Sequence, residues 1–361
     1  MTEYKNEIYI ENDDTRIDKI EQVLPPVALL EKFPASETAV KVVRKTRKKA
    51  HDIIHQKDDR LLVIIGPCSI HDPVSALDYA RRLKAMREKY QDTLEIIMRV
   101  YFEKPRTTVG WKGLINDPNL NGTFELNEGL RIARKLLSDI NDLSVPAAGE
   151  FLDMITPQYV ADFMSWGAIG ARTTESQVHR ELASGLSCAV GFKNGTNGSV
   201  KIALDAMGAA EAPHYFLSVT KFGHSAIVST KGNEDCHIIL RGGEQGPNYS
   251  EEDVNAVCAD IEKSGRIPHV MVDFSHANSC KQFKKQLDVC QSVCDQIRKG
   301  SKQIFGVMIE SHLVEGRQDL VDGKAITYGQ SITDACIGWD DSEEVLAALS
   351  SAVLARRQLT K

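Results

Sequence analysis

Short runs of apolar and β-branched residues alternate with longer amphipathic stretches along most of the chain after residue 60. Runs of this kind, bounded by polar or glycine-rich turns, predict buried strands, and the stretches between them predict helices. We expect strands at 61–65, 94–100, 147–151, 168–171, 189–192, 237–240, 269–274 and 304–309. We expect helices at 73–89, 129–140, 157–166, 175–184, 200–210, 251–264 and 281–299. Strands and helices that alternate in this way predict an α/β fold, the closed parallel (β/α)8 or TIM barrel.

Two segments depart from this repeat. Residues 1–55 read as an N-terminal arm and helix, with a short strand predicted at 8–10 and the helix at 36–55. Near residues 214–236, before the sixth strand, two alternating runs predict an inserted antiparallel hairpin. The predicted organisation is therefore an arm followed by one barrel domain over residues 56–361.

Composition and charge argue against a nucleic-acid-binding protein and against a membrane protein. Hydrophobic residues make up 42% and charged residues 26% of the chain, as in an ordinary globular protein, and the formal net charge is −6. The chain has no block of five or more Lys or Arg residues, which disfavours nucleic acid or an anionic membrane as a partner. Its acidic N-terminus lacks an apolar signal segment, and no apolar run approaches the length of a membrane span. We therefore expect a cytoplasmic protein whose eight cysteines, none of them in a C-x-x-C pair, stay reduced.

Charged residues gather where the predicted strands end. In a parallel barrel the carboxyl ends of the strands form one rim, which carries the active site. Several of these ends are cationic, namely Arg99, Lys104, Arg172, Lys193 and Arg241. Positive charges on one rim would repel one another unless a compact anion lay among them, so the ligand should carry phosphate and carboxylate together.

The turn after residue 100 adds to this picture. Pro105 holds Lys104 and Arg106 apart, and Thr107 adds a hydroxyl, so the turn suits a small polyanion. A solvated basic loop explains a lone Lys-Pro-Arg turn equally well.

A second group at the same rim consists of metal-ligating residue types. Cys68, His276 and Glu310 follow three of the predicted strands, and Asp334 lies in the loop after the last one. Thiolate, imidazole and carboxylate together suit one divalent ion such as Mn, Fe, Co or Zn. Each residue taken singly also fits a structural role, as a core thiol, a barrel histidine or the partner of a lysine. A cation beside an anion pocket would polarise a carbonyl oxygen, and this combination indicates carbon–carbon bond formation.

His51 and His55 lie four residues apart on the predicted N-terminal helix, as zinc ligands often do. Asp52 stands where a metalloprotease carries its general base, a glutamate. We interpret the pair as two histidines on a surface helix.

Seven motifs follow one another along the chain: Gly66-Pro-Cys-Ser-Ile-His71, Lys104-Pro-Arg-Thr-Thr-Val-Gly-Trp-Lys-Gly113, Gly170-Ala-Arg-Thr-Thr-Glu-Ser-Gln177, Gly191-Phe-Lys-Asn-Gly195, Leu240-Arg-Gly-Gly243, Asp273-Phe-Ser-His276 and Ser331-Ile-Thr-Asp-Ala-Cys336. Together they resemble the type I 3-deoxy-D-arabino-heptulosonate 7-phosphate (DAHP) synthases, especially the phenylalanine-sensitive bacterial members. The resemblance covers nearly the whole chain. It implies the first step of the shikimate pathway, in which phosphoenolpyruvate condenses with erythrose 4-phosphate and releases phosphate on a metal-dependent barrel.

The resemblance also implies roles for single residues. Phosphoenolpyruvate would be bound by Arg99, Lys104, Arg172, Lys193 and Arg241. Erythrose 4-phosphate would meet Pro105, Arg106 and Thr107. One divalent ion, Mn, Fe, Co or Zn, would be held by Cys68, His276, Glu310 and Asp334. Lys104 is the expected proton donor to the new alkoxide, and Glu150 is expected to help position the attacking water.

Feedback inhibition by an aromatic amino acid is a further implication, with phenylalanine as the expected effector. The effector pocket would include Asp13, Asp14, Gln158 and Ser187, with the aspartates meeting the ammonium group of the effector. The two aspartates alone also fit a frayed acidic terminus. Such regulation fits a homodimer or homotetramer in which the N-terminal arm contacts a neighbouring subunit.

Three alternatives stay open. A sibling synthase would join phosphoenolpyruvate to a longer sugar phosphate or aldose, although the long arm and the Trp111-Lys-Gly113 continuation favour the four-carbon sugar. A Schiff-base aldolase would use Lys193 without a metal and would be trapped by borohydride. A catalytically inactive barrel would serve only as an aromatic amino acid sensor, but neither the cationic set nor the metal set has a gap.

Overall fold

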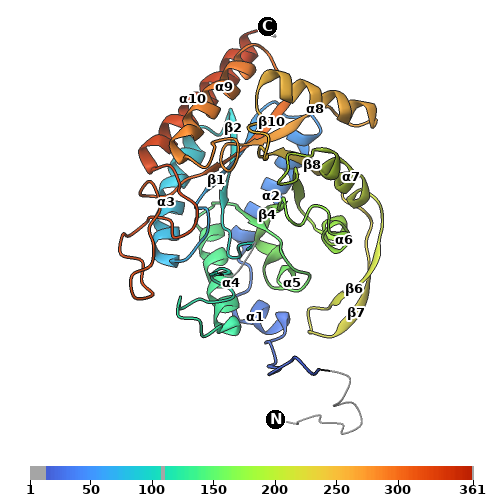
Figure 1. The fold of residues 1–361 in the computed structure, drawn as a ribbon, viewed down its shortest axis with the longest axis vertical. Coiled ribbons are helices and arrows are strands. Elements are labelled where there is room, and N and C mark those ends of the chain that lie inside the picture. Colours follow the sequence, from blue (N-terminus) through green and yellow to red (C-terminus); the bar gives the residue numbers. More distant parts are fainter. Residues whose placement is uncertain (1–13, 107–109, 360–361) are drawn as a thin grey trace.

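The computed structural model describes residues 14–106 and 110–359, so the strand predicted at 8–10 and the predicted site residues Asp13 and Thr107 lie outside it. Parallel strands close into a barrel in the order β1-β10-β9-β8-β5-β4-β3-β2 (Figure 1). Their bounds are β1 Leu61–Gly66, β2 Leu94–Arg99, β3 Ala147–Glu150, β4 Met164–Ile169, β5 Ala189–Lys193, β8 Cys236–Leu240, β9 Val270–Asp273 and β10 Ile304–Glu310. The predicted (β/α)8 barrel is therefore confirmed.

Amphipathic helices surround the barrel and bury their apolar faces against it. Their bounds are α3 Pro73–Lys89, α4 Leu126–Asp142, α5 Pro157–Val160, α6 Gln177–Gly185, α7 Lys201–Ala210, α8 Glu251–Lys263, α9 Gln286–Arg298 and α10 Trp339–Leu359, with short 3-10 turns η1 at Ala161–Phe163 and η2 at Phe283–Lys285. Helix α10 is not among the predicted helices, and it packs along α9. Within the described part of the chain, no helix combines the length and apolar character needed to cross a lipid bilayer.

The helix predicted at 157–166 is wrong over its second half. Helix α5 ends at Val160, a 3-10 turn follows, and β4 begins at Met164, earlier than the strand predicted at 168–171. Every residue of β4 is buried, because the strand has the barrel interior on one side and helices on the other. Such a strand lacks the polar and apolar alternation that would separate it from a helix in the sequence.

Two helices precede the barrel. Helix α1 (Pro26–Lys32) begins at Pro26, where a proline is well tolerated because the first helical N–H has no partner within the helix. Helix α2 (Glu37–Ile54) begins after Ser36, whose side chain accepts a hydrogen bond from the Ala39 N–H at 3.0 Å.

The end of α2 closes the amino end of the barrel. Ala50, Ile53 and Ile54 are buried in one apolar cluster with interior residues of the barrel such as Leu62 and Trp166. The barrel is therefore filled by side chains and plugged at this end, and its other end carries the carboxyl termini of the strands.

The predicted hairpin is present between β5 and β8. Strands β6 (Tyr215–Val219) and β7 (Ser225–Ser229) pair in an antiparallel arrangement and project from the barrel on the same side as α1 (Figure 1). The turn of the hairpin contacts α1, because the Lys221 carbonyl accepts a hydrogen bond from the Val27 N–H at 2.7 Å.

Candidate active site

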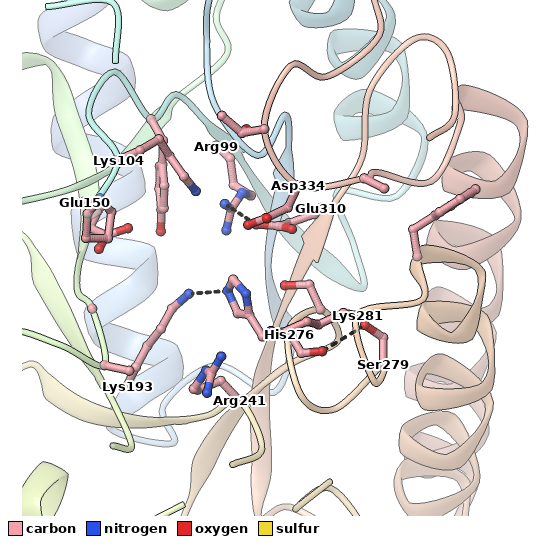
Figure 2. Close-up of a pocket in the computed structure, with 18 of the residues that line it drawn as sticks. Arg99, Lys104, Glu150, Lys193, Arg241, His276, Ser279, Lys281, Glu310 and Asp334 are labelled. Atoms are coloured by element: carbon pink, nitrogen blue, oxygen red, sulfur yellow. Dashed lines mark hydrogen bonds and ion pairs between the residues drawn. The ribbon is translucent and has the colours of Figure 1, made fainter. Parts of the chain in front are cut away.

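A cavity of about 530 Å³ opens at the carboxyl ends of the barrel strands (Figure 2). Its lining contains all five cations singled out in the sequence, together with Pro105, Arg106, Glu150, His276, Glu310 and Asp334. The cations and three of the four predicted metal ligands, which are far apart in the sequence, thus face one space, and the fourth, Cys68, is buried and does not line it.

Arg99 lies at the bottom of this cavity and is completely buried. Its Nη2 donates to Glu310 Oε1 at 3.1 Å, its Nε donates to the Pro67 carbonyl at 3.3 Å, and its guanidinium lies 4.1 Å from the centre of the Tyr101 ring. Its Nη1 has no hydrogen-bond partner among the described residues. Because a buried donor without a partner is costly, this N–H is suited to bind an anionic ligand.

Lys193 forms the second buried ion pair of the cavity. Its Nζ lies 2.9 Å from Asp273 Oδ2 and 3.0 Å from His276 Nε2. Burial alone would raise the pKa of Asp273, but the positive charge of Lys193 and the nearby His276 hold it well below its usual range. Asp273 therefore stays ionised. Sequence reasoning assigned it no role, although it lies in the same motif as His276.

Three of the four predicted metal ligands lie together. Cys68 Sγ and one carboxylate oxygen from each of Glu310 and Asp334 are all within 4.8 Å of one another. His276 lines the same cavity, but its Nε2 faces Lys193 and lies 3.3 Å from Asp273 Oδ2. A thiol and two carboxylates, with an imidazole nearby, fit the ligand preferences of Mn, Fe, Co or Zn.

The pKa of the Cys68 thiol is raised because the side chain is enclosed by the protein. Burial raises the pKa of its thiol to about 12, and the negative charge of Glu310 adds to the increase. Its Sγ accepts a hydrogen bond from Lys104 Nζ at 3.1 Å and lies 3.5 Å from Asp334 Oδ2. A cation bound here would replace the thiol proton.

Two further residues position the carboxylates. The side chain of Gln286 donates to the Glu310 carbonyl at 2.9 Å and accepts from the Glu310 N–H at 3.0 Å, which fixes the end of β10. A Cβ at Gly170 would lie 2.3 Å from Glu150 Oε1, so a larger residue there would displace this carboxylate from its position. Neither residue was identified as part of the site from the sequence, because both act through contacts between separate elements.

The three described effector residues of the prediction do not line the cavity, and Asp13 lies outside the described residues. Asp14 is exposed at the start of the described chain, Gln158 lies on α5, and Ser187 is exposed in the loop between α6 and β5. The hairpin contacts the last two regions, because Lys221 Nζ donates to the Gln158 carbonyl and the Thr230 hydroxyl hydrogen-bonds to the end of α6.

Comparisons with known proteins agree with this architecture. The model of the DAHP synthetase I family matches residues 32–347. The chain is 81% identical over 360 residues to a phospho-2-dehydro-3-deoxyheptonate aldolase of Haemophilus influenzae, covering 100% of this chain and 99% of that protein. It is 68% identical over 347 residues to the Phe-sensitive phospho-2-dehydro-3-deoxyheptonate aldolase of Escherichia coli K12, covering 96% and 99% of the two chains. The solved structure of phospho-2-dehydro-3-deoxyheptonate aldolase from Francisella tularensis SCHU S4 superposes with a TM-score of 0.92 at 53% identity, covering 94% and 99%.

The buried pair between Lys193 and Asp273 yields a stability prediction. Asp273→Asn should lower the free energy of unfolding in urea by about 3 to 5 kcal/mol, because it leaves a buried ammonium without its counter-charge. The matched control is Asp205→Asn, which breaks the exposed pair between Lys201 and Asp205, and it should cost less than about 0.5 kcal/mol. Equal losses in the two variants would contradict the assignment of the Lys193 pair as a constraint on the fold.

Glu103 yields a prediction about pH. Burial raises its pKa to about 8, and negative charge at Asp153 and Glu150 adds to the increase. In the unfolded chain the same carboxyl has a pKa near 4.3, so between these values the folded state binds more protons and stability falls as pH rises.

Glu103→Gln should therefore flatten this decline. We expect the unfolding free energy of the wild type to fall relative to the variant by about 1 kcal/mol per pH unit between pH 5 and pH 8. Urea unfolding at several pH values measures this difference, and the exposed Glu262→Gln serves as the control that should run parallel to the wild type. A parallel pH profile for Glu103→Gln would refute the prediction.

Proposed function

The chain belongs to the DAHP synthetase I family, and from this premise we propose that its reaction uses one divalent metal ion held by Cys68, His276, Glu310 and Asp334. The reaction condenses phosphoenolpyruvate with D-erythrose 4-phosphate and water to give DAHP and inorganic phosphate, the first step towards chorismate and the aromatic amino acids. The observation that carries the metal proposal is the cluster of Cys68 Sγ with carboxylate oxygens of Glu310 and Asp334 beside a cationic cavity. A metal ion there would lie next to a bound anion.

The proposed binding of phosphoenolpyruvate rests on an excess of cations. Glu310 and Asp273 already balance Arg99 and Lys193. The described lining of the cavity contains six further cations, against two further carboxylates, Glu150 and Asp334; the cations are Lys104, Arg106, Arg172, Arg241, Lys281 and Arg317. A ligand that carries both a phosphate and a carboxylate supplies the negative charge that this excess favours.

Erythrose 4-phosphate is assigned to the outer part of the cavity. Pro105 and Arg106 line it, and Arg106 is exposed, so its guanidinium is accessible to the phosphate of an incoming sugar. Thr107 completes the proposed sugar site and lies outside the described residues.

The chemistry follows from these positions. When bound, the metal ion supplies Lewis acidity that polarises the aldehyde oxygen of the sugar phosphate. Carbon 3 of phosphoenolpyruvate attacks the aldehyde carbon, and Lys104 donates a proton to the resulting alkoxide oxygen. Burial alone would lower the pKa of Lys104, but Cys68, Glu310 and Asp334 raise it, so the ammonium form is present to donate.

Water completes the reaction. Positive charge develops at carbon 2 of phosphoenolpyruvate as carbon 3 forms the new bond, and water adds there to give a hemiketal phosphate. Glu150 is half-buried at the end of β3 and lines the cavity, and we assign it the positioning of this water. Cleavage of the carbon–oxygen bond to phosphate then leaves the 2-keto group and releases inorganic phosphate.

The alternative use of Lys193 as a Schiff-base nucleophile is disfavoured. Nucleophilic attack needs a neutral amine, whereas Lys193 forms a buried ion pair with Asp273 at 2.9 Å. That arrangement suits the binding of an anion.

The enzyme is feedback-inhibited by an aromatic amino acid, and we assign phenylalanine as the effector. The identity of 68% to a Phe-sensitive relative supports this choice. The proposed pocket combines Asp13, Asp14, Gln158 and Ser187, and we propose that it works within a homodimer or homotetramer. The β6–β7 hairpin, which contacts the α5 region and the end of α6, would connect the parts of this pocket.

Metal removal tests the first proposal. Treatment with EDTA should abolish phosphate release from phosphoenolpyruvate plus erythrose 4-phosphate, and Mn²⁺ should restore it. Cys68→Ala should lower kcat/KM at limiting Mn²⁺ by more than the roughly 10-fold to 100-fold typical of residues that only orient a ligand. Cys258→Ala, which also removes a buried thiol but lies on α8, is the matched control. Full activity of metal-free protein would overturn the proposal.

The effector is tested in the same assay with single amino acids. Phenylalanine should suppress phosphate release, and tyrosine and tryptophan should not. Asp14→Asn should raise the phenylalanine concentration for half-inhibition about tenfold or more, because a hydrogen bond to a charged group contributes about 1.5 to 3 kcal/mol. Asp18→Asn, at an exposed position nearby, is the control. Inhibition by tyrosine or tryptophan alone, or identical behaviour of the two variants, would exclude this pocket.

A further inference from the structure

We propose a second metal site, formed by His51, His55 and Asp235, which takes a borderline divalent cation such as Zn²⁺. His51 lies in the last turn of α2, His55 caps the end of that helix, and Asp235 directly precedes β8. The site is therefore at the amino ends of the strands, on the face opposite the cavity. It is independent of the proposed function.

The three side chains converge on one point. His51 Nδ1 lies 2.8 Å and His55 Nε2 lies 2.9 Å from the same oxygen, Asp235 Oδ1. The three donor atoms are all within 4.8 Å of one another. Two imidazoles and a carboxylate match the ligand set of zinc sites that keep a fourth position for water.

Only a small rearrangement would admit the ion. Ligand atoms about 2.1 Å from a tetrahedral zinc ion lie about 3.4 Å from one another, so these contacts must open by roughly half an ångström. The three side chains are 23%, 24% and 20% exposed, which leaves room for this movement and access for a water ligand.

The carboxylate is held in place without a metal. The Asp235 N–H donates to Asn233 Oδ1 at 3.1 Å, and Asn233 is buried with its Nδ2 donating to the carbonyls of Ala183 at 3.1 Å and Cys188 at 3.0 Å. A ligand fixed by its own hydrogen bonds loses little freedom when it binds an ion.

The surrounding charge also favours a cation. The site lies at the carboxyl end of α2, where the helix dipole is negative, and it includes the Asp235 carboxylate. Lys57 Nζ lies 3.4 Å from His51 Nε2, the ring nitrogen that faces away from Asp235, and Lys57 is exposed and can turn into solvent.

Hydrogen bonding alone and metal binding require different protonation states of the two imidazoles. If both imidazoles donate to Asp235, each must carry a proton on the nitrogen that faces it, and an ion would replace both protons. Bound there, the ion would connect α2, the helix that plugs the barrel, to the start of β8.

The test is a cobalt and zinc titration of the metal-stripped full-length protein. We expect two Co²⁺ equivalents, one with the sulfur-to-metal charge-transfer band of a thiolate ligand, from Cys68, and one with tetrahedral d–d absorption but no thiolate band. Only the equivalent with the thiolate band involves Cys68. If the proposed active-site metal is wrong, this band will be absent, and the d–d absorption of the second site will remain. A single equivalent in the wild type, accompanied by the thiolate band, would overturn the second site.

Variants assign the second equivalent to these residues. His55→Gln and Asp235→Asn should lower the affinity of this site for Zn²⁺ at least about tenfold in equilibrium dialysis, since each variant removes a direct ligand. Two variants serve as controls. Asp52→Asn removes a carboxylate that pairs with Lys48 on the same helix, and His224→Gln removes an exposed histidine in the hairpin turn. Both controls should bind Zn²⁺ at this site as tightly as the wild type. Equal zinc affinity in His55→Gln and Asp52→Asn would refute the site.

Discussion

Buried positive charge is the constraint on which the cavity depends. Arg99 at the end of β2 pairs with Glu310 at the end of β10, and Lys193 at the end of β5 pairs with Asp273 at the end of β9. Each pair skips one strand of the barrel, β1 in the first case and β8 in the second. An unpaired charge at either position would be costly, so the ion pairs fix the relative positions of strand ends that share no backbone hydrogen bonds.

One of these carboxylates, Glu310, links the proposed anion and metal subsites. Glu310 holds Arg99 and also belongs to the cluster with Cys68 and Asp334. Lys104 hydrogen-bonds to Cys68, so a cationic group is in direct contact with a thiol of the proposed metal site. A change in charge on one side of the cavity therefore alters the electrostatic environment of the other.

The sequence predicts the architecture well where pattern and position suffice. Helix α3 has the predicted bounds and β1 differs by one residue, because an apolar run between clear turn signals is unambiguous. The rule that chemistry gathers at the carboxyl ends of strands correctly places Cys68, Glu310 and Asp334 together.

The failures have a common physical origin, which is contact between distant segments. Strand β4 is buried on both sides and has no periodic signal. Asp273 and Gln286 owe their roles to partners on other elements. Asp235 approaches His51 and His55, which lie 184 and 180 residues before it, and no spacing rule could reveal this contact.

The plug formed by the end of α2 also limits the side from which a ligand can reach the cavity. Ala50, Ile53 and Ile54 close the amino end of the filled barrel, so within the described residues the cavity opens at the carboxyl ends of the strands. The buried Arg99 lies deep within it, and the exposed Arg106 lies nearer to solvent. On the proposed assignment, phosphoenolpyruvate would lie deeper in the cavity than erythrose 4-phosphate, so we expect it to bind first.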